Sequence, residues 1–214
     1  MVTKEILGTI RLMAVCRHAY FSMIFLLVAL SGCGVSNVVI EGSFPTPNIN
    51  KIPLDIAVYY DDALSEFSYM EYSETGQEEF NIESGQSHIE LFNAVLPGMF
   101  DRVIVLDNLE DARSEGVDVV FTPEIEEFQL ALPGKTKLDV YEVWIKYNMR
   151  LLTAEGDHIA DWVLTSYGKT PTANLRSTAD GINEATIVAL RDLASSFSLS
   201  FGQVPEVRDW LSSL

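Results

Sequence analysis

Two histidines, His88 and His158, and two groups of acidic residues have the side chains best suited to catalysis. An imidazole can act as a general base near neutral pH. The adjacent carboxylates Asp61 and Asp62, or those in the run Glu124–Glu127, could form an acid–base pair or bind calcium. The sequence contains no G-x-S-x-G elbow, no H-E-x-x-H motif, no glycine-rich phosphate loop and no EF-hand spacing. We therefore expect the histidines and acids to be solvated, with His88 at a helix start and His158 in a turn.

Cys33 is the residue whose surroundings predict a covalent modification. It follows a segment in which three bases and one acid precede an apolar run over residues 19–30. Twelve helical residues rise about 18 Å, which is well short of the roughly 30 Å hydrocarbon core of a bilayer. The run is therefore typical of a secretion signal rather than of a membrane-spanning helix. The only other cysteine, Cys16, lies within this leader, so the mature chain would carry no free thiol beyond Cys33.

The residues before the cysteine, Leu30-Ser31-Gly32-Cys33, resemble the bacterial lipobox. The resemblance implies that Leu30, Ser31 and Gly32 form the recognition site of a signal peptidase and that residues 1–32 are removed. It also implies that the Cys33 sulfur receives a diacylglycerol and that the new N-terminal amine receives a third acyl chain. Palmitate is expected among these acyl chains. Three acyl chains anchor a protein stably, whereas one holds it only marginally.

The residue after this cysteine is Gly34 rather than aspartate. By resemblance to lipoprotein sorting in enteric bacteria, Gly34 implies the periplasmic face of the outer membrane over the inner membrane. The translation start is left open between Met1, Met13 and Met23.

The composition narrows the classes of partner. The 214 residues carry a formal charge of −17, with 31 acidic against 14 basic side chains, and 48% of them are hydrophobic. A chain this apolar can bury a core. Nucleic acid is excluded as a partner because binding to phosphate backbones depends on lysine and arginine. We expect no metal and no cofactor other than the lipid on Cys33.

The pattern of apolar residues predicts a tether over 33–52 and one α+β domain over 53–214. The sheet is expected to be antiparallel or mixed, with a long C-terminal hairpin, and two helices are expected on one face. Pro123 should interrupt one strand, and Ser87 with Glu90 should cap the central helix. The predicted strands are 54–60, 66–83 (a hairpin), 102–106, 117–121, 125–132, 141–152 and 159–167, and the predicted helices begin at 87, 182 and 205.

Two features suggest a binding surface. Residues 52–101 hold 11 acids and no lysine or arginine, so Asp61 and Asp62 could face a basic partner or simply be repelled by an anionic membrane. Trp144 and Trp162 lie on the two strands of the long hairpin. Each could be a hot spot for binding or could pack beneath the C-terminal helix.

The order of elements resembles a group of envelope lipoproteins. The likeness includes a run formed by Asp118, Val120, Ile125 and Phe128 before the long hairpin. The group contains the amino-terminal domain of TolB, the curli secretion channel subunit and the auxiliary lipoproteins of lipid-transport ABC systems. It implies a non-enzymatic accessory or assembly factor that binds an envelope protein. A carrier of a lipid or small apolar ligand and an envelope hydrolase are the alternatives.

Overall fold

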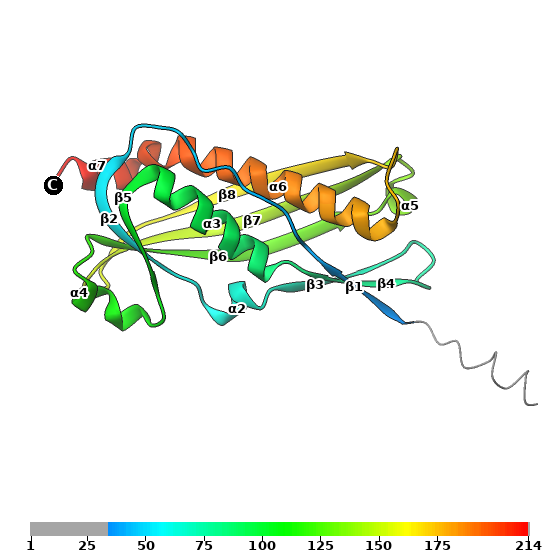
Figure 1. Ribbon diagram of the computed structural model, residues 1–214, viewed down its shortest axis with the longest axis horizontal. Helices are drawn as coiled ribbons and strands as arrows, with labels where there is room; N and C mark the ends of the chain where they lie inside the picture. The colour runs from blue at the N-terminus through cyan, green and yellow to red at the C-terminus, as the bar shows by residue number, and fades with distance from the viewer. Residues whose placement is uncertain (1–33, 214) are drawn as a thin grey trace, which may run out of the picture. The chain divides into compact units, whose positions relative to one another are not determined.

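The computed structural model describes residues 34–213, in which two sheets are combined with helices (Figure 1). The strands are β1 (Val35–Val39), β2 (Ile52–Tyr59), β3 (Ser68–Tyr72), β4 (Glu79–Glu83), β5 (Phe100–Leu106), β6 (Val119–Ala131), β7 (Val140–Thr153) and β8 (His158–Pro171). The helices are α2 (Asp62–Ser65), α3 (Gly85–Met99), α4 (Ala112–Glu115), α5 (Pro133–Thr136), α6 (Thr178–Ser200) and α7 (Pro205–Leu211), with 3₁₀ turns at Leu109–Asp111 and Phe201–Gln203.

The larger sheet has five strands in the order β5-β2-β6-β7-β8. Strands β5, β2 and β6 run parallel, and β6, β7 and β8 are antiparallel. The smaller sheet has the order β1-β4-β3, with β3 and β4 forming the predicted hairpin. The α+β fold class with a mixed sheet is therefore confirmed.

The long hairpin follows the alternation of its sequence. One face of β7 buries Val143, Ile145, Tyr147, Met149 and Leu151, while the residues between them are exposed or half-buried. The expected interruption at Pro123 is wrong, because β6 is one continuous strand. Strand β2 accompanies β6 only from Val119 to Phe121, so Pro123 lies where no strand on that side needs a backbone donor.

Helices α3 and α6 cover one face of the larger sheet (Figure 1), as the sequence predicts. Helix α6 begins after Ser177, whose side chain accepts a hydrogen bond from the Asp180 amide. The capping box predicted for α3 is wrong, since α3 begins at Gly85 and the Ser87 hydroxyl instead donates to the Ile40 carbonyl. A buried hydrogen bond to the N-terminal segment thus replaces the expected cap.

Aromatic rings fill the space between the sheet and the two helices. The Phe197 ring from α6 lies 5.1 Å from that of Phe121, 5.8 Å from Phe92 and 6.4 Å from Trp162. Phe92, Phe121 and Phe197 are completely buried, and Trp162 is half-buried against them. Aromatic pairs at such separations stabilise a core beyond the contribution of their buried area.

The N-terminal segment differs from the predicted tether. Residues 35–39 form β1, which pairs in parallel with β4, and Val38 and Ile40 are buried. The chain then runs along α6, where the Glu41 amide donates to Asn183 and Arg191 donates to the Ser43 carbonyl. The compact unit therefore begins at Val35 rather than at Pro53.

Gly168→Ala tests the packing of α6 on β8. A Cβ at this position would overlap the carbonyl oxygen of Ala185 and the amide nitrogen of Ala189, so the helix would have to move away from the sheet. We expect a loss of about 1–3 kcal/mol in the free energy of unfolding, measured by urea denaturation. Gly202→Ala is the matched control because nothing lies within 4 Å of its added Cβ. Equal losses in the two variants would contradict the packing.

Candidate functional site

The predicted lipidation residues, Leu30, Ser31, Gly32 and Cys33, lie outside the described residues, as does the signal peptide over 1–32. Gly34 is the first described residue, and β1 starts at the next one. No helix within residues 34–213 has the length and hydrophobicity needed to cross a membrane.

His88 is buried in the core, which corrects the expectation of a solvated residue. Its Nε2 lies 3.0 Å from the Ser84 hydroxyl, and its Nδ1 hydrogen-bonds the hydroxyl of Tyr147. Burial lowers the pKa of His88 to about 3 and raises that of Tyr147, so both groups stay neutral. A neutral pair without access to solvent links α3 to β7 and is structural.

The other candidate catalytic groups lie on the surface. His158 is exposed, as predicted, with its Nε2 3.2 Å from Asp161. The guanidinium of Arg150 lies between Asp161, at 3.0 Å, and Glu124, at 3.1 Å. Among residues 34–213 no cluster of three or more His, Cys, Asp and Glu could hold a metal ion. These acids form ion pairs across strands β6, β7 and β8.

Asp61 and Asp62 have different roles. The Asp61 side chain accepts a hydrogen bond from the Leu64 amide and caps α2, whereas Asp62 is exposed in the first turn of that helix. Elsewhere in the acidic stretch, Glu71 is buried and ion-paired with Lys135 of α5. Part of the negative charge therefore stabilises local structure, and only the exposed part is available to a partner.

The two tryptophans of the hairpin point to opposite faces of the sheet. Trp162 belongs to the aromatic core beneath α6, while Trp144 is 40% exposed on the face opposite α3 and α6. We call that opposite side the outer face. Trp162 therefore packs in the core, and its prediction as a partner-binding residue is wrong. Trp144 is exposed, so core packing is wrong for it and it stays a candidate for binding.

Trp144 forms an exposed aromatic pair on the outer face. Its ring lies 5.1 Å from that of Tyr167, and the Tyr167 hydroxyl donates a 2.6 Å hydrogen bond to Glu142. This hydrogen bond to a carboxylate raises the pKa of Tyr167 to about 12. The pair is therefore held in place on β7 and β8 and remains a neutral hydrogen-bonding aromatic surface at physiological pH.

A shallow pocket of about 250 Å³ adjoins Trp144. Lys146 lies in the wall of this pocket and forms an ion pair with Glu126. The hydrogen bond that it donates to the Glu126 carboxylate raises the pKa of Lys146. The remaining walls come from three strands: Glu127, Gln129, Ile145, Thr165 and Ser166. We define the outer-face patch as Trp144, Tyr167, Val163 and this pocket. Tyr167 was not singled out from the sequence, although its alternation with Trp162 along β8 places it on the same side as Trp144.

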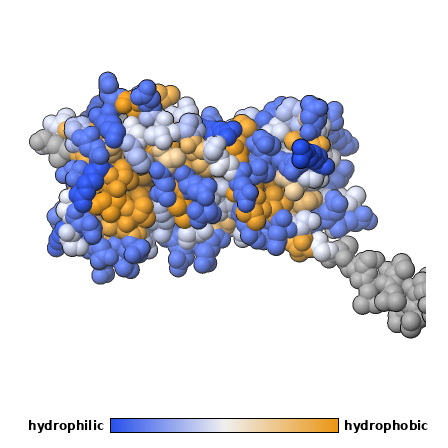
Figure 2. All heavy atoms as spheres, viewed as in Figure 1, coloured by the Kyte–Doolittle hydropathy of each residue, from blue (hydrophilic) through white to orange (hydrophobic). Residues whose placement is uncertain are grey.

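A second apolar surface lies over β5, one of the two edge strands of the larger sheet. Val105 is exposed there, and apolar residues gather over this side of the unit in Figure 2. Arg102 and Asp55 form an ion pair beside it, 3.2 Å apart. Charged side chains along an edge strand discourage uncontrolled strand pairing.

No family model and no curated protein matches the sequence. A protein of the DUF330 family from Xanthomonas campestris is similar over 84% of this chain and all of its own, with 13% identity and a TM-score of 0.54. The PelC dodecamer from Paraburkholderia phytofirmans matches 72% of this chain and 91% of its own, at 20% identity and a TM-score of 0.39. A minor lipoprotein from Acinetobacter baumannii matches 70% and 92%, at 8% identity and 0.37. At 13% identity, the likeness to the DUF330 protein shows a shared fold alone.

The buried imidazole of His88 predicts a pH dependence of stability. Its pKa is about 3 in the folded chain and near 6.5 when unfolded, so its contribution is fully present above pH 6.5 and is lost as the pH falls toward 3. We expect the stability difference between wild type and His88→Gln to shrink by about 1.4 kcal/mol per pH unit below 6.5. Chemical denaturation between pH 7.5 and 4.5 measures it, with His158→Gln as the control for loss of an exposed imidazole. If the free energy of unfolding depends on pH in the same way for wild type and His88→Gln, the assignment of His88 as a buried neutral imidazole is contradicted.

Proposed function

We propose that this chain is an outer-membrane lipoprotein on the periplasmic side, anchored through acylated Cys33, and that it acts as a non-enzymatic accessory factor. Its α+β domain binds an envelope protein through the outer-face patch. The observation that carries the proposal is the exposed Trp144–Tyr167 pair on a sheet face that α3 and α6 leave uncovered. The lipobox sequence supports the anchor, and Gly34 supports the choice of membrane.

The chemistry of the patch suits a protein partner. Tryptophan and tyrosine are enriched among residues that dominate binding energy, especially when polar groups surround them. Lys146 is paired with Glu126, and Arg150 is paired with Glu124 and Asp161. The carboxylates of Glu127 and Glu142 instead accept hydrogen bonds from Gln129 and Tyr167. A partner that covers the patch would therefore need a cation or hydrogen-bond donors opposite Glu127 and Glu142, whereas the other charges can be covered as existing pairs.

The alternatives receive less support from the structure. A lipid carrier needs an apolar cavity between the sheet and α6, but the rings of Phe92, Phe121, Phe197 and Trp162 occupy that space. A hydrolase that uses His88 would need a route for its substrate, and this imidazole is completely buried. Neither observation points to a small substrate, and both favour a binding role.

A photo-crosslinking residue in place of Trp144 tests the partner surface. We expect one discrete crosslinked product in living cells, because a hot-spot position lies against its partner in the complex. The same residue at Val188, which is exposed on α6, should give no such product. Equal labelling from both positions, or none from Trp144, would contradict the assignment of the patch.

Cys33→Ala tests the anchor. Without the thiol no diacylglycerol can be attached, so labelled palmitate should no longer be incorporated and the protein should no longer fractionate with the outer membrane. Fractionation of wild-type and variant cells measures both effects. A variant that stays in the outer-membrane fraction at the wild-type level would show that Cys33 is not the anchor there.

A further inference from the structure

The distance between the proposed lipid and the folded domain is very short. Gly34 is the only residue between Cys33 and Val35, and Val35 is already paired with Glu79 of β4. Two residues of extended chain span at most about 7 Å. The polar layer on each side of the hydrocarbon core is itself roughly 5–8 Å thick. Acylation of Cys33 would therefore hold the start of β1 at the level of the lipid headgroups.

The smaller sheet presents an exposed side at this point. Across its three strands Val35 is aligned with Glu79 and Tyr72, and the next exposed row contains Asn37, Asn81 and Met70. Val35 is 50% exposed, Tyr72 47% and Met70 40%. We call the residues Val35, Met70, Tyr72 and Glu79 the anchor-proximal face.

We propose that the anchor-proximal face lies against the bilayer that holds Cys33 and contacts its headgroup layer. The inference rests on the proposed acylation of Cys33 and adds an orientation to it. Tyrosine favours the membrane interface because its ring is apolar and its hydroxyl can stay hydrated. Val35 in the same row and Met70 in the next row add exposed apolar area.

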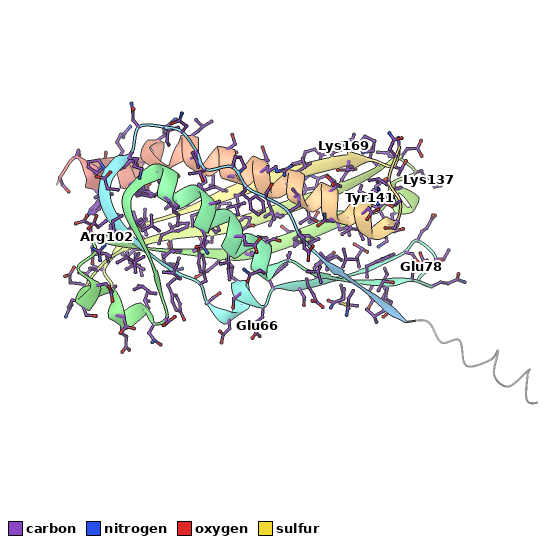
Figure 3. All side chains as sticks on the ribbon, in the orientation of Figure 1. Glu66, Glu78, Arg102, Lys137, Tyr141 and Lys169 are labelled. Carbon is purple, nitrogen blue, oxygen red and sulfur yellow. The ribbon has the colours of Figure 1, made fainter. Side chains whose placement is uncertain are left out.

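The charges of this face limit how deep the contact is. Glu79 lies between Val35 and Tyr72, and a carboxylate is not stable in hydrocarbon. It can remain ionised among headgroups, where the ammonium of phosphatidylethanolamine is a complementary partner. Lys137 and Lys169 lie at the same end of the folded unit as Glu78 (Figure 3) and can face lipid phosphates. The chemistry therefore fits a shallow contact with a zwitterionic surface.

The orientation has a consequence for the rest of the domain. Strands β1, β3 and β4 lie at one end of the folded unit, and α4 and α7 lie at the other (Figure 1). With the first end held at the membrane, the far end reaches into the aqueous compartment. The outer-face patch contains Tyr167, two residues from Lys169, so it lies toward the membrane end of the folded unit, on the outer face of β7 and β8.

An environment-sensitive fluorophore at Tyr72→Cys tests the contact in the acylated full-length protein. Because Cys33 is acylated and Cys16 is removed with the leader, the introduced thiol is the only reactive one. The protein is reconstituted in vesicles of phosphatidylethanolamine and phosphatidylglycerol that contain a lipid with a headgroup-level quencher. We expect several-fold stronger quenching at Tyr72→Cys than at Leu199→Cys, which is 65% exposed on α6. Met70→Cys should behave like Tyr72→Cys.

A longer connection provides the matched control. Inserting about eight Gly and Ser residues after Gly34 lets the domain move roughly 15 Å from the anchor, so quenching at Tyr72→Cys should fall. If the protein floats with the vesicles but Met70→Cys, Tyr72→Cys and Leu199→Cys are quenched equally, the contact between the anchor-proximal face and the bilayer is overturned. The anchor at Cys33 would remain. Protein that fails to float with the vesicles would overturn the anchor and the contact together.

Discussion

The close packing of α6 on the β7–β8 hairpin is the interaction on which the other features depend. It requires a glycine at Gly168, because the backbone of α6 at Ala185 and Ala189 leaves no room for a side chain. This approach brings Phe197 into the aromatic core and determines which side of the sheet is filled. The opposite side of β7 and β8 remains exposed, and with it Trp144. The candidate binding surface is therefore a consequence of where the helix packs.

Elements that are determined by local periodicity could be predicted from the sequence. The two long strands of the hairpin and the apolar spacing of α6 are confirmed, because one face of each buries its apolar residues. The same alternation separates the two tryptophans. Trp144 lies between buried residues of β7 and so points to the opposite face, whereas Trp162 is paired with the buried Met149 and points to the core. The sequence alone could not say which side the helices would cover, so the expected core packing of Trp144 is wrong.

Features that depend on distant partners could not be predicted. Strand β1 is paired with β4, and its own sequence, although it contains three valines, has no alternation of apolar and polar residues that would indicate a strand. The sequence places His88 at a helix start, where a residue is usually solvated. It is buried because it packs against and hydrogen-bonds Tyr147, which lies 59 residues further along the chain. Pro123 suggests a break, and the strand continues because β2 has already ended beside it. In each case tertiary contacts override a local signal.

The anchor connects these observations to a role in the cell envelope. A lipid on Cys33 would place β1 at a membrane, expose the outer face beside it and leave an acidic domain in the periplasm. Mass spectrometry of the protein purified from its native membrane tests this most directly. The account predicts an N-terminal peptide that begins at Cys33 and carries a diacylglycerol on sulfur and an acyl chain on the new amine. A mature chain that begins elsewhere, or a Cys33 with an unmodified thiol, would contradict it.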